Sequence, residues 1–207
     1  MKKLTFATIA ALICVIMTSC GNTENNTASS GQAQLNGESA LDMIMTRTSV
    51  RQYSDKPISE ATIDTLLRAG MAAPTAGNKQ PWKFVVVTER ALLDSLAQGN
   101  WRMAAHAQAA IVVCGDTENV FPEEGRDYWV QDCSAATENI LLAAHAVGLG
   151  AVWCGCYPIS ERVSNVKRIF GLPTPIVPLS VVVLGYPAGE HQPKDKYKPE
   201  NIHFNKW

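Results

Sequence analysis

The sequence lacks an excess of charge of either sign. Its 207 residues include 18 Lys and Arg against 19 Asp and Glu, which gives a formal net charge of -1. A nucleic-acid-binding surface needs an excess of basic residues to neutralise phosphates, so the composition gives no indication of such a partner. The sequence also lacks internal repeats. With 46% hydrophobic residues, it is typical of a globular protein that is long enough to bury one core.

Residues that would bind a metal or act as a nucleophile are also few. The histidines at 106, 145, 191 and 203 share no metal-ligand spacing, and we interpret His145 as a satisfied interior or interface residue. In Cys154-Gly155-Cys156 a single residue separates the cysteines, without the two-residue spacer of thioredoxin-like sites and without a second ligand pair. No catalytic triad or paired carboxylate is recognisable. The sequence therefore predicts no metal site.

The N-terminus has the pattern of an export signal. Lys2 and Lys3 precede the apolar run 4–17, which is too short for a comfortable membrane span, and small residues then lead to Cys20. This segment resembles the signals of bacterial lipoproteins, which implies that residues 1–20 are a signal peptide and that Cys20 is acylated. A cleaved soluble export signal and an uncleaved anchor remain alternatives. We expect a lipid-anchored protein of the bacterial cell envelope, facing the periplasm or the surface.

Residues 21–37 are rich in Asn, Thr, Ser, Gly and Gln and contain almost no apolar side chain. Such a segment buries too little surface to offset the entropy of ordering it, so we expect a disordered tether. Residues 38–207 form the expected folded domain. The chain would then be a folded domain joined to its lipid anchor by a flexible tether.

Four cysteines remain in the expected domain, and all lie in apolar runs: Cys114, Cys133, Cys154 and Cys156. Free cysteine in such a setting behaves as a small hydrophobe, so we favour buried free thiols. Because export permits disulfides, a structural disulfide remains the alternative.

Strand-like and helix-like segments alternate along the domain. The spacing of apolar residues, caps and breakers predicts helices over 39–46, 59–73, 89–97, 101–107, 127–147 and 160–170, and strands over 83–88, 109–114, 151–154 and 176–185. The strands do not alternate cleanly between polar and apolar residues, which is typical of a sheet covered on both faces.

Two short motifs indicate a binding site. Residues 47–51, Arg-Thr-Ser-Val-Arg, combine two cations and two hydroxyls in a pattern suited to a phosphate group. Residues 74–82, Pro-Thr-Ala-Gly-Asn-Lys-Gln-Pro-Trp, form a restricted turn whose amides can donate and accept hydrogen bonds. Such amides suit a flat heterocycle with imide-like edges.

Together these motifs resemble the nitroreductase family of FMN-dependent oxidoreductases, which is marked by Arg-x-Ser-x-Arg followed by Asn-x-Gln-Pro-Trp. The resemblance covers roughly residues 40–207. It implies an α+β fold in three α/β/α layers, with a mixed sheet wrapped by helices. It also implies an intertwined homodimer with non-covalent FMN at the interface.

The resemblance implies a role for several positions. The FMN phosphate and ribityl group would be held by Arg47, Thr48, Ser49 and Arg51, with Lys194 and Lys196 closing over the phosphate. The turn that reaches the flavin of the partner subunit would be Pro74, Thr75, Ala76 and Asn78. The loop over the isoalloxazine would be Val152, Trp153, Cys154 and Gly155, with a backbone N–H near Cys154 or Gly155 donating to flavin N5. The simpler alternatives are a solvated basic turn, an ordinary proline turn and a core strand end.

The resemblance further implies hydride transfer from NAD(P)H through flavin N5 to a nitroaromatic, quinone or similar small aromatic acceptor, in a ping-pong cycle. Export conflicts with this donor, because reduced nicotinamides are scarce outside the cytoplasm. The alternatives are a flavin-binding or flavin-delivery lipoprotein without turnover, a reductive dehalogenase-like or flavin-modifying member of the family, and a structural lipoprotein.

Overall fold

The computed structural model describes residues 39–207. The predicted signal, Cys20 and the tether therefore lie outside the described residues. Within 39–207, no helix has both the length and the hydropathy needed to cross a membrane.

A four-stranded sheet forms the centre of the domain, in the order β1-β2-β4-β3. The strands are β1 (Trp82–Val87), β2 (Ala109–Asp116), β3 (Gly150–Gly155) and β4 (Ile176–Gly185). All three strand pairs are antiparallel. The resemblance implies a mixed sheet. Among residues 39–207, the only parallel pairing is one isolated bridge between Ser49 and Ala151.

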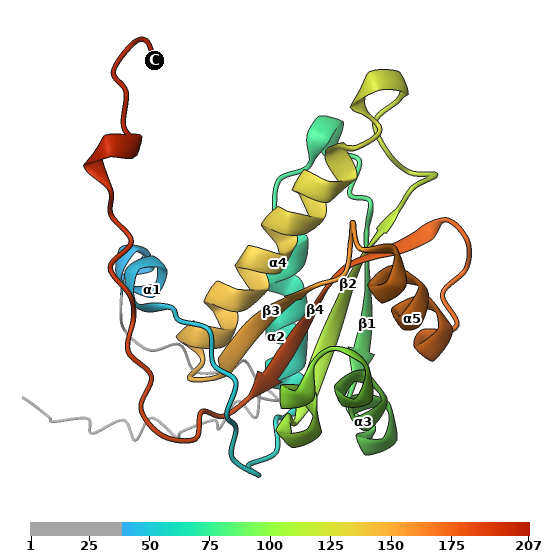
Figure 1. Ribbon diagram of the computed structural model, residues 1–207, viewed down its shortest axis with the longest axis vertical. Coiled ribbons are helices and arrows are strands. Elements are labelled where there is room, and N and C mark those ends of the chain that lie inside the picture. The colour runs from blue at the N-terminus through green and yellow to red at the C-terminus, as the bar shows by residue number, and fades with distance from the viewer. Residues whose placement is uncertain (1–38) are drawn as a thin grey trace, which may run out of the picture. The chain divides into compact units, whose positions relative to one another are not determined.

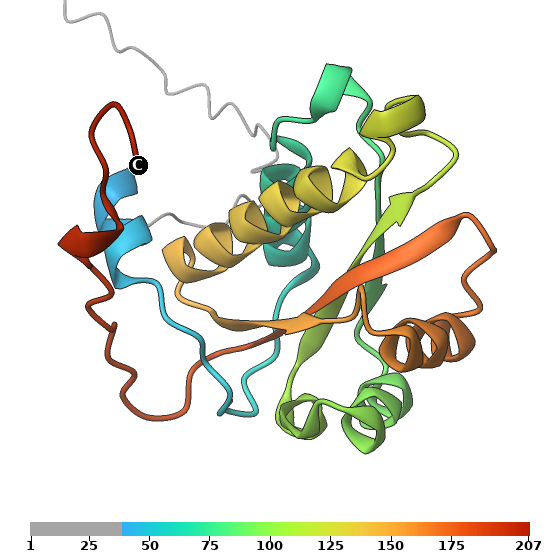
Figure 2. The same ribbon diagram turned by 45° about the horizontal axis from the view of Figure 1, so that its top comes forward.

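Helices cover both faces of this sheet, as the sequence predicts. The covering helices are α2 (Glu60–Met71), α3 (Arg90–Gly99), α4 (Tyr128–Ala146) and α5 (Ser160–Phe170), and the short helix α1 (Ala40–Thr46) lies to one side of the sheet (Figure 2). Figure 2 shows α2 and α4 above the sheet and α3 and α5 below it. The result is the expected three-layer α/β/α arrangement, which Figure 1 shows from a second direction.

Alternating residues of the central strands supply the two cores. In β2, Ile111 and Val113 face the α2/α4 layer, and Ala110 and Val112 face the α3/α5 layer. All four are fully buried. Because both faces are buried, the strand appears in the sequence as a continuous apolar run.

Local signals set the ends of several helices. Ser39 and Asp42 form the expected capping box of α1, and the side chain of Ser59 caps α2. The predicted helix at 101–107 is instead a single 3₁₀ segment, Arg102–His106. Ser160, expected as a cap, is the first residue of α5, and Gly171 ends that helix in the left-handed conformation (φ 61°).

Candidate functional site

The segment 47–54 lies along the outer edge of β3. The Val50 N–H donates to the Ala151 carbonyl (2.9 Å), and the Ser54 N–H donates to the Tyr186 carbonyl (2.9 Å). Val50 is buried against Gly150, where an added Cβ would lie 2.6 Å from its side chain. These contacts hold the segment in one register against the sheet.

Tyr53 anchors the same segment to the sheet through its buried side chain. Its hydroxyl contacts the carbonyls of Val50 (2.7 Å) and Val183 (3.2 Å), and burial raises the pKa of the phenol. The ring occupies the space where Gly185 lacks a side chain, since an added Cβ there would lie 2.7 Å from Tyr53. The segment is therefore fixed at both ends.

The four predicted phosphate-binding residues lie on this anchored segment. Arg47 follows α1, and its Nε pairs with Glu138 Oε1 of α4 at 3.3 Å, with 17% of the arginine side chain exposed. Thr48 is half-buried, and Ser49 and Arg51 are exposed. The structure thus presents two cations and two hydroxyls beside β3.

The predicted flavin-facing residues form β3 itself. Val152 and Cys154 are buried, whereas 36% of Trp153 is exposed. Burial raises the pKa of the Cys154 thiol to about 12, and the positive charge of Arg51 partly opposes this rise.

The hydrogen bonds of β3 show which backbone N–H is free for a ligand. Ala151 directs its carbonyl outward to Val50, and the Cys156 N–H is directed inward to the Leu179 carbonyl (2.8 Å). Because successive residues of a strand point their backbone groups to opposite edges, the Cys154 N–H faces β4 and the Gly155 N–H faces outward. Sequence reasoning left both positions open, and the register favours Gly155.

Space is also available at Gly155. A Cβ built on this residue would meet no atom within 4 Å, and the Gly155 carbonyl accepts a hydrogen bond from Arg162 Nη1 at 3.1 Å. The outward face of Gly155 can therefore accept a flat group against the backbone.

The predicted turn at 74–78 follows α2. Gly77 and Asn78 adopt positive φ (55° and 54°), and the Gln80 N–H donates to Thr75 Oγ1 (3.1 Å). Pro74 and Asn78 are exposed, and Thr75 and Ala76 are half-buried. The turn is thus ordered by its own polar groups.

Asp132 of α4 holds this turn, which sequence reasoning did not identify. The Ala76 N–H donates to Asp132 Oδ1 at 2.8 Å, and Asp132 is only 6% exposed. The two residues are 56 positions apart in the chain, so no local pattern joins them. The contact becomes visible only in the structure, where the buried carboxyl group of Asp132 lies beside the turn.

We expect Asp132→Ala to lower the free energy of unfolding by about 1–3 kcal/mol, because it leaves a partly buried N–H without its acceptor. Urea denaturation of the wild-type and variant proteins measures this loss. Asp132→Asn keeps an acceptor oxygen and should recover most of the stability. Equal stability of Asp132→Ala and wild type would contradict the role of this contact.

Within one chain, α4 separates the two groups of predicted site residues. The 74–78 turn contacts Asp132, whereas Thr46 Oγ1 hydrogen-bonds with His145 Nε2 at 2.8 Å near the other end of α4. Thirteen residues of helix correspond to about 20 Å. Arg47, however, pairs with Glu138, which is six residues after Asp132, or about 9 Å along α4.

Lys194 and Lys196 are exposed in the segment that follows β4. The start of this segment returns to the candidate site, since the Ala188 N–H donates to the Gln52 carbonyl (3.0 Å). Figures 1 and 2 show the later part of the segment running beside α1. The two lysines thus lie on the irregular segment that leads away from the candidate site.

A cavity of about 220 Å³ adjoins the predicted phosphate-binding residues. It lies between the ends of α1 and α4, the start of β3 and the segment after β4. Its polar lining residues are Thr46, Arg47, Thr48, His145 and His191. Sequence reasoning did not place His191 in a site.

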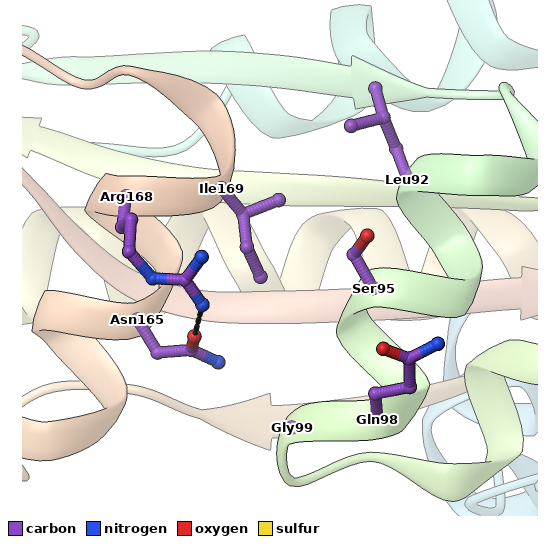
Figure 3. Close-up of a pocket in the computed structure, with 7 residues that line it drawn as sticks. All are labelled: Leu92, Ser95, Gln98, Gly99, Asn165, Arg168 and Ile169. Atoms are coloured by element: carbon purple, nitrogen blue, oxygen red, sulfur yellow. Dashed lines mark hydrogen bonds between the residues drawn. The ribbon is translucent and has the colours of Figure 1, made fainter.

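A second hollow, of about 410 Å³, lies between α3 and α5 and contains none of the predicted site residues. Figure 3 shows Ser95 and Gln98 of α3 facing Asn165 and Arg168 of α5. Arg168 Nη2 donates to Asn165 Oδ1 at 2.7 Å. This groove is separate from the candidate site on β3.

All four cysteines of the domain are buried and free, as the sequence favours. Burial raises the pKa of Cys114, Cys154 and Cys156 to about 12 and also raises that of Cys133. Among residues 39–207, no three His, Cys, Asp or Glu side chains are arranged to hold a metal ion. These thiols are therefore packing residues.

We expect the four thiols to resist alkylation by iodoacetamide at pH 8 in the native protein. With a pKa of about 12, roughly one thiol in ten thousand is ionised at that pH. Peptide mapping by mass spectrometry before and after unfolding in urea measures the labelling. Rapid native labelling of Cys154 would show that the end of β3 is more open than described.

The chain matches known proteins over most of its length. A family model described as the Nitroreductase family matches residues 44–101 and 93–186. A protein of Archaeoglobus fulgidus, provisionally named an NADH dehydrogenase/NAD(P)H nitroreductase, is 48% identical over 82% of this chain and 99% of that protein. A Bacteroides thetaiotaomicron structure of the same provisional name has a TM-score of 0.78 at 47% identity, covering 83% and 100% of the two chains. A nitroreductase structure from Desulfovibrio desulfuricans, also provisionally named and solved in complex with FMN, has a TM-score of 0.70 at 27% identity and covers 83% and 99%.

Proposed function

Because the chain belongs to the nitroreductase family, we propose that it is an FMN-dependent oxidoreductase. In this proposal it passes hydride from a reduced nicotinamide to an electron-poor acceptor such as a nitroaromatic or a quinone. The observation that carries the proposal is the outer edge of β3. There segment 47–51, with its two arginines, pairs with Ala151, and the outward Gly155 N–H follows four residues later along the same edge.

The described residues fit this cofactor. The open space at Gly155 can receive one face of a flat ring, and its outward N–H can donate to a ring nitrogen. Arg47, Thr48, Ser49 and Arg51 supply donors for a phosphate group and a ribityl chain. Ala151, beside Ser49, lies four residues before Gly155, or about 13 Å along the strand. A ribityl chain that links a ring to a phosphate can bridge this separation.

Bound FMN supplies the redox chemistry, and the protein supplies position and electrostatics. The Gly155 N–H, fixed by the ladder of β3, holds a hydrogen-bond donor at the ring without depending on a side chain. With FMN bound, a donor in this position would stabilise negative charge that develops on the ring. The nicotinamide and the acceptor then use the same open face in turn, which corresponds to a ping-pong cycle.

We further propose that the working unit is an intertwined homodimer. The 74–78 turn contacts α4 at Asp132 and Arg47 contacts it at Glu138. The family resemblance supports the proposal that the turn reaches the flavin of a second copy. Apolar side chains on α1 and at the C-terminus are exposed and could pack against that copy: Leu41, Ile44, Met45, Phe204 and Trp207. Size-exclusion chromatography with light scattering tests this assembly, and a monomer that retains FMN would contradict it.

Release of the cofactor tests the proposed activity. Protein purified without added flavin should yield FMN on denaturation, identified by its mass and its absorption spectrum. Steady-state reduction of a nitroaromatic and of a quinone at varied NADH concentration should give the parallel reciprocal plots of a ping-pong cycle. FMN that is reduced but is not reoxidised by any acceptor would instead indicate a flavin-binding protein without turnover.

The location of the enzyme is a separate proposal. We propose that residues 1–20 direct export to the bacterial cell envelope and that Cys20 carries the lipid anchor, on the basis of the charged, apolar and small-residue pattern there. The electron donor in that compartment would then be a nicotinamide supplied locally or another reductant. Membrane fractionation of wild type and Cys20→Ala tests the anchor, since loss of Cys20 should release the protein from the membrane.

A further inference from the structure

Arg162 of α5 reaches the end of β3 that carries the proposed ring site. Its Nη1 donates to the Gly155 carbonyl at 3.1 Å, and the residue is half-buried. The N–H and the carbonyl of one residue in a strand point to the same edge, so the Gly155 carbonyl lies on the outward edge together with the Gly155 N–H. The guanidinium group therefore lies at the edge of β3 where we place the flavin ring.

This cation has no acid paired with it. Within residues 39–207, the arginines that pair with a carboxylate are Arg47, Arg68 and Arg90. The hydrogen bond to Gly155 uses one of the five N–H donors of Arg162, and a carbonyl does not neutralise its charge. Burial raises the pKa of the Cys154 and Cys156 thiols, and the positive charge of Arg162 partly opposes this rise. The charge of Arg162 therefore acts on the end of β3.

The position of Arg162 in its helix is unfavourable for a cation. It lies in the first turn of α5, where the helix dipole favours anions. Ile159, the N-cap residue, makes no side-chain hydrogen bond to the helix start. The adjacent Glu161 is exposed and lines a hollow between α5 and the end of α3. A residue that breaks a local rule in this way indicates a role outside its own helix.

We propose that Arg162 is a positioning residue for the flavin ring and that its charge raises the reduction potential of bound FMN. The inference rests on the proposed function and adds to it a residue outside the motifs at 47–51 and 74–82. The hydrogen bond of Arg162 fixes the backbone at Gly155, whose N–H faces the ring.

The charge of Arg162 acts on the reduced form of the cofactor. A hydride carries two electrons and one proton, so the nicotinamide is oxidised and gains one positive charge, while the ring is reduced and gains one negative charge. A nearby cation stabilises the charged reduced ring more than the neutral oxidised ring. Reduced FMN is then bound more tightly than oxidised FMN, which raises the potential.

Arg162→Gln tests the role of the charge in the full-length, FMN-bound protein. Glutamine keeps an N–H donor for the Gly155 carbonyl but carries no charge. The preference for reduced over oxidised FMN should fall about tenfold, which lowers the two-electron potential by about 30 mV. Affinity for oxidised FMN should stay close to that of wild type. Equilibration with a reference dye during anaerobic reduction measures the potential, and titration of the apo-protein measures the affinity.

Two further variants separate charge from position. Arg162→Lys keeps the charge and should keep a potential close to that of wild type. Arg162→Ala also removes the hydrogen bond to Gly155 and should in addition weaken binding of oxidised FMN about fivefold. Arg168→Gln is the matched control, because Arg168 belongs to the same helix but lines the groove between α3 and α5 (Figure 3). The control should leave both the potential and the affinity unchanged.

An unchanged potential in Arg162→Gln would overturn the inference. An equal fall in Arg162→Gln and Arg162→Lys would also overturn it, because such a result indicates a structural effect of the substitution. Both results differ from a failure of the proposed function, in which the wild-type protein binds no FMN and the inference falls with it.

Discussion

Replacing Gly155 with valine is expected to abolish tight FMN binding while the protein still folds. A Cβ built at this position would meet no atom of the described chain within 4 Å, so the first atom of the new side chain introduces no internal clash. Valine also favours the strand conformation. The same side chain would occupy the face where we place the flavin ring. Overpacking of this kind costs about 1–3 kcal/mol, so we expect FMN affinity to fall by about 5- to 150-fold.

Isothermal titration with FMN and thermal denaturation measure the two effects separately. Gly155→Ala provides the graded control, because it keeps the N–H and adds only one methyl group. We expect it to weaken FMN binding less than valine does and to leave the melting temperature unchanged. If Gly155→Val binds FMN as wild type does, the ring does not lie over this part of β3.

Arg47→Ala is expected to weaken FMN binding by about 1.5–3 kcal/mol, the usual contribution of a hydrogen bond to a charged group. Arg47 is largely buried at the end of α1 and lines the 220 Å³ cavity, so its charge is poorly screened by solvent. Riboflavin, which lacks the phosphate, should bind the variant and the wild type alike. Titration of the apo-protein with both flavins measures the difference.

Arg68→Ala is the matched control for the loss of an arginine paired with an acid. Arg68 pairs with Asp64 on the exposed side of α2, where 78% of its side chain is accessible, and it lines neither the cavity nor β3. Exposed pairs of this kind contribute little, so this variant should keep wild-type FMN affinity. Unchanged FMN titration of Arg47→Ala would remove Arg47 from the site.

The parts of the fold that follow from local chemistry could be predicted from the sequence. The capping box of Ser39 and Asp42, the cap at Ser59 and the stop at Gly171 each depend on neighbouring residues, and all are present. The run 83–88, expected to be a buried strand, is instead the half-buried edge strand β1, because only β2 pairs with it. The order of the strands depends on which distant strands pair, and a run of valines does not indicate its pairing partner.

The same distinction applies to the candidate site. The motif at 47–51 could be identified from its residue types, and the structure places it against β3. The choice between the N–H groups of Cys154 and Gly155 required the register of the sheet. The contact of Asp132 with the 74–78 turn and the position of His191 in the cavity beside Arg47 each bring together segments that are distant in the sequence. The roles assigned to individual residues stay predictions that the variants above test.

The most direct test of the central proposal is the absorption spectrum of the purified full-length protein before and after anaerobic addition of NADH. The proposal predicts a yellow protein that contains FMN, loses its absorbance near 450 nm with NADH, and recovers it when a nitroaromatic is added. A protein that remains colourless after incubation with excess FMN would contradict the proposed flavin site and leave only the fold.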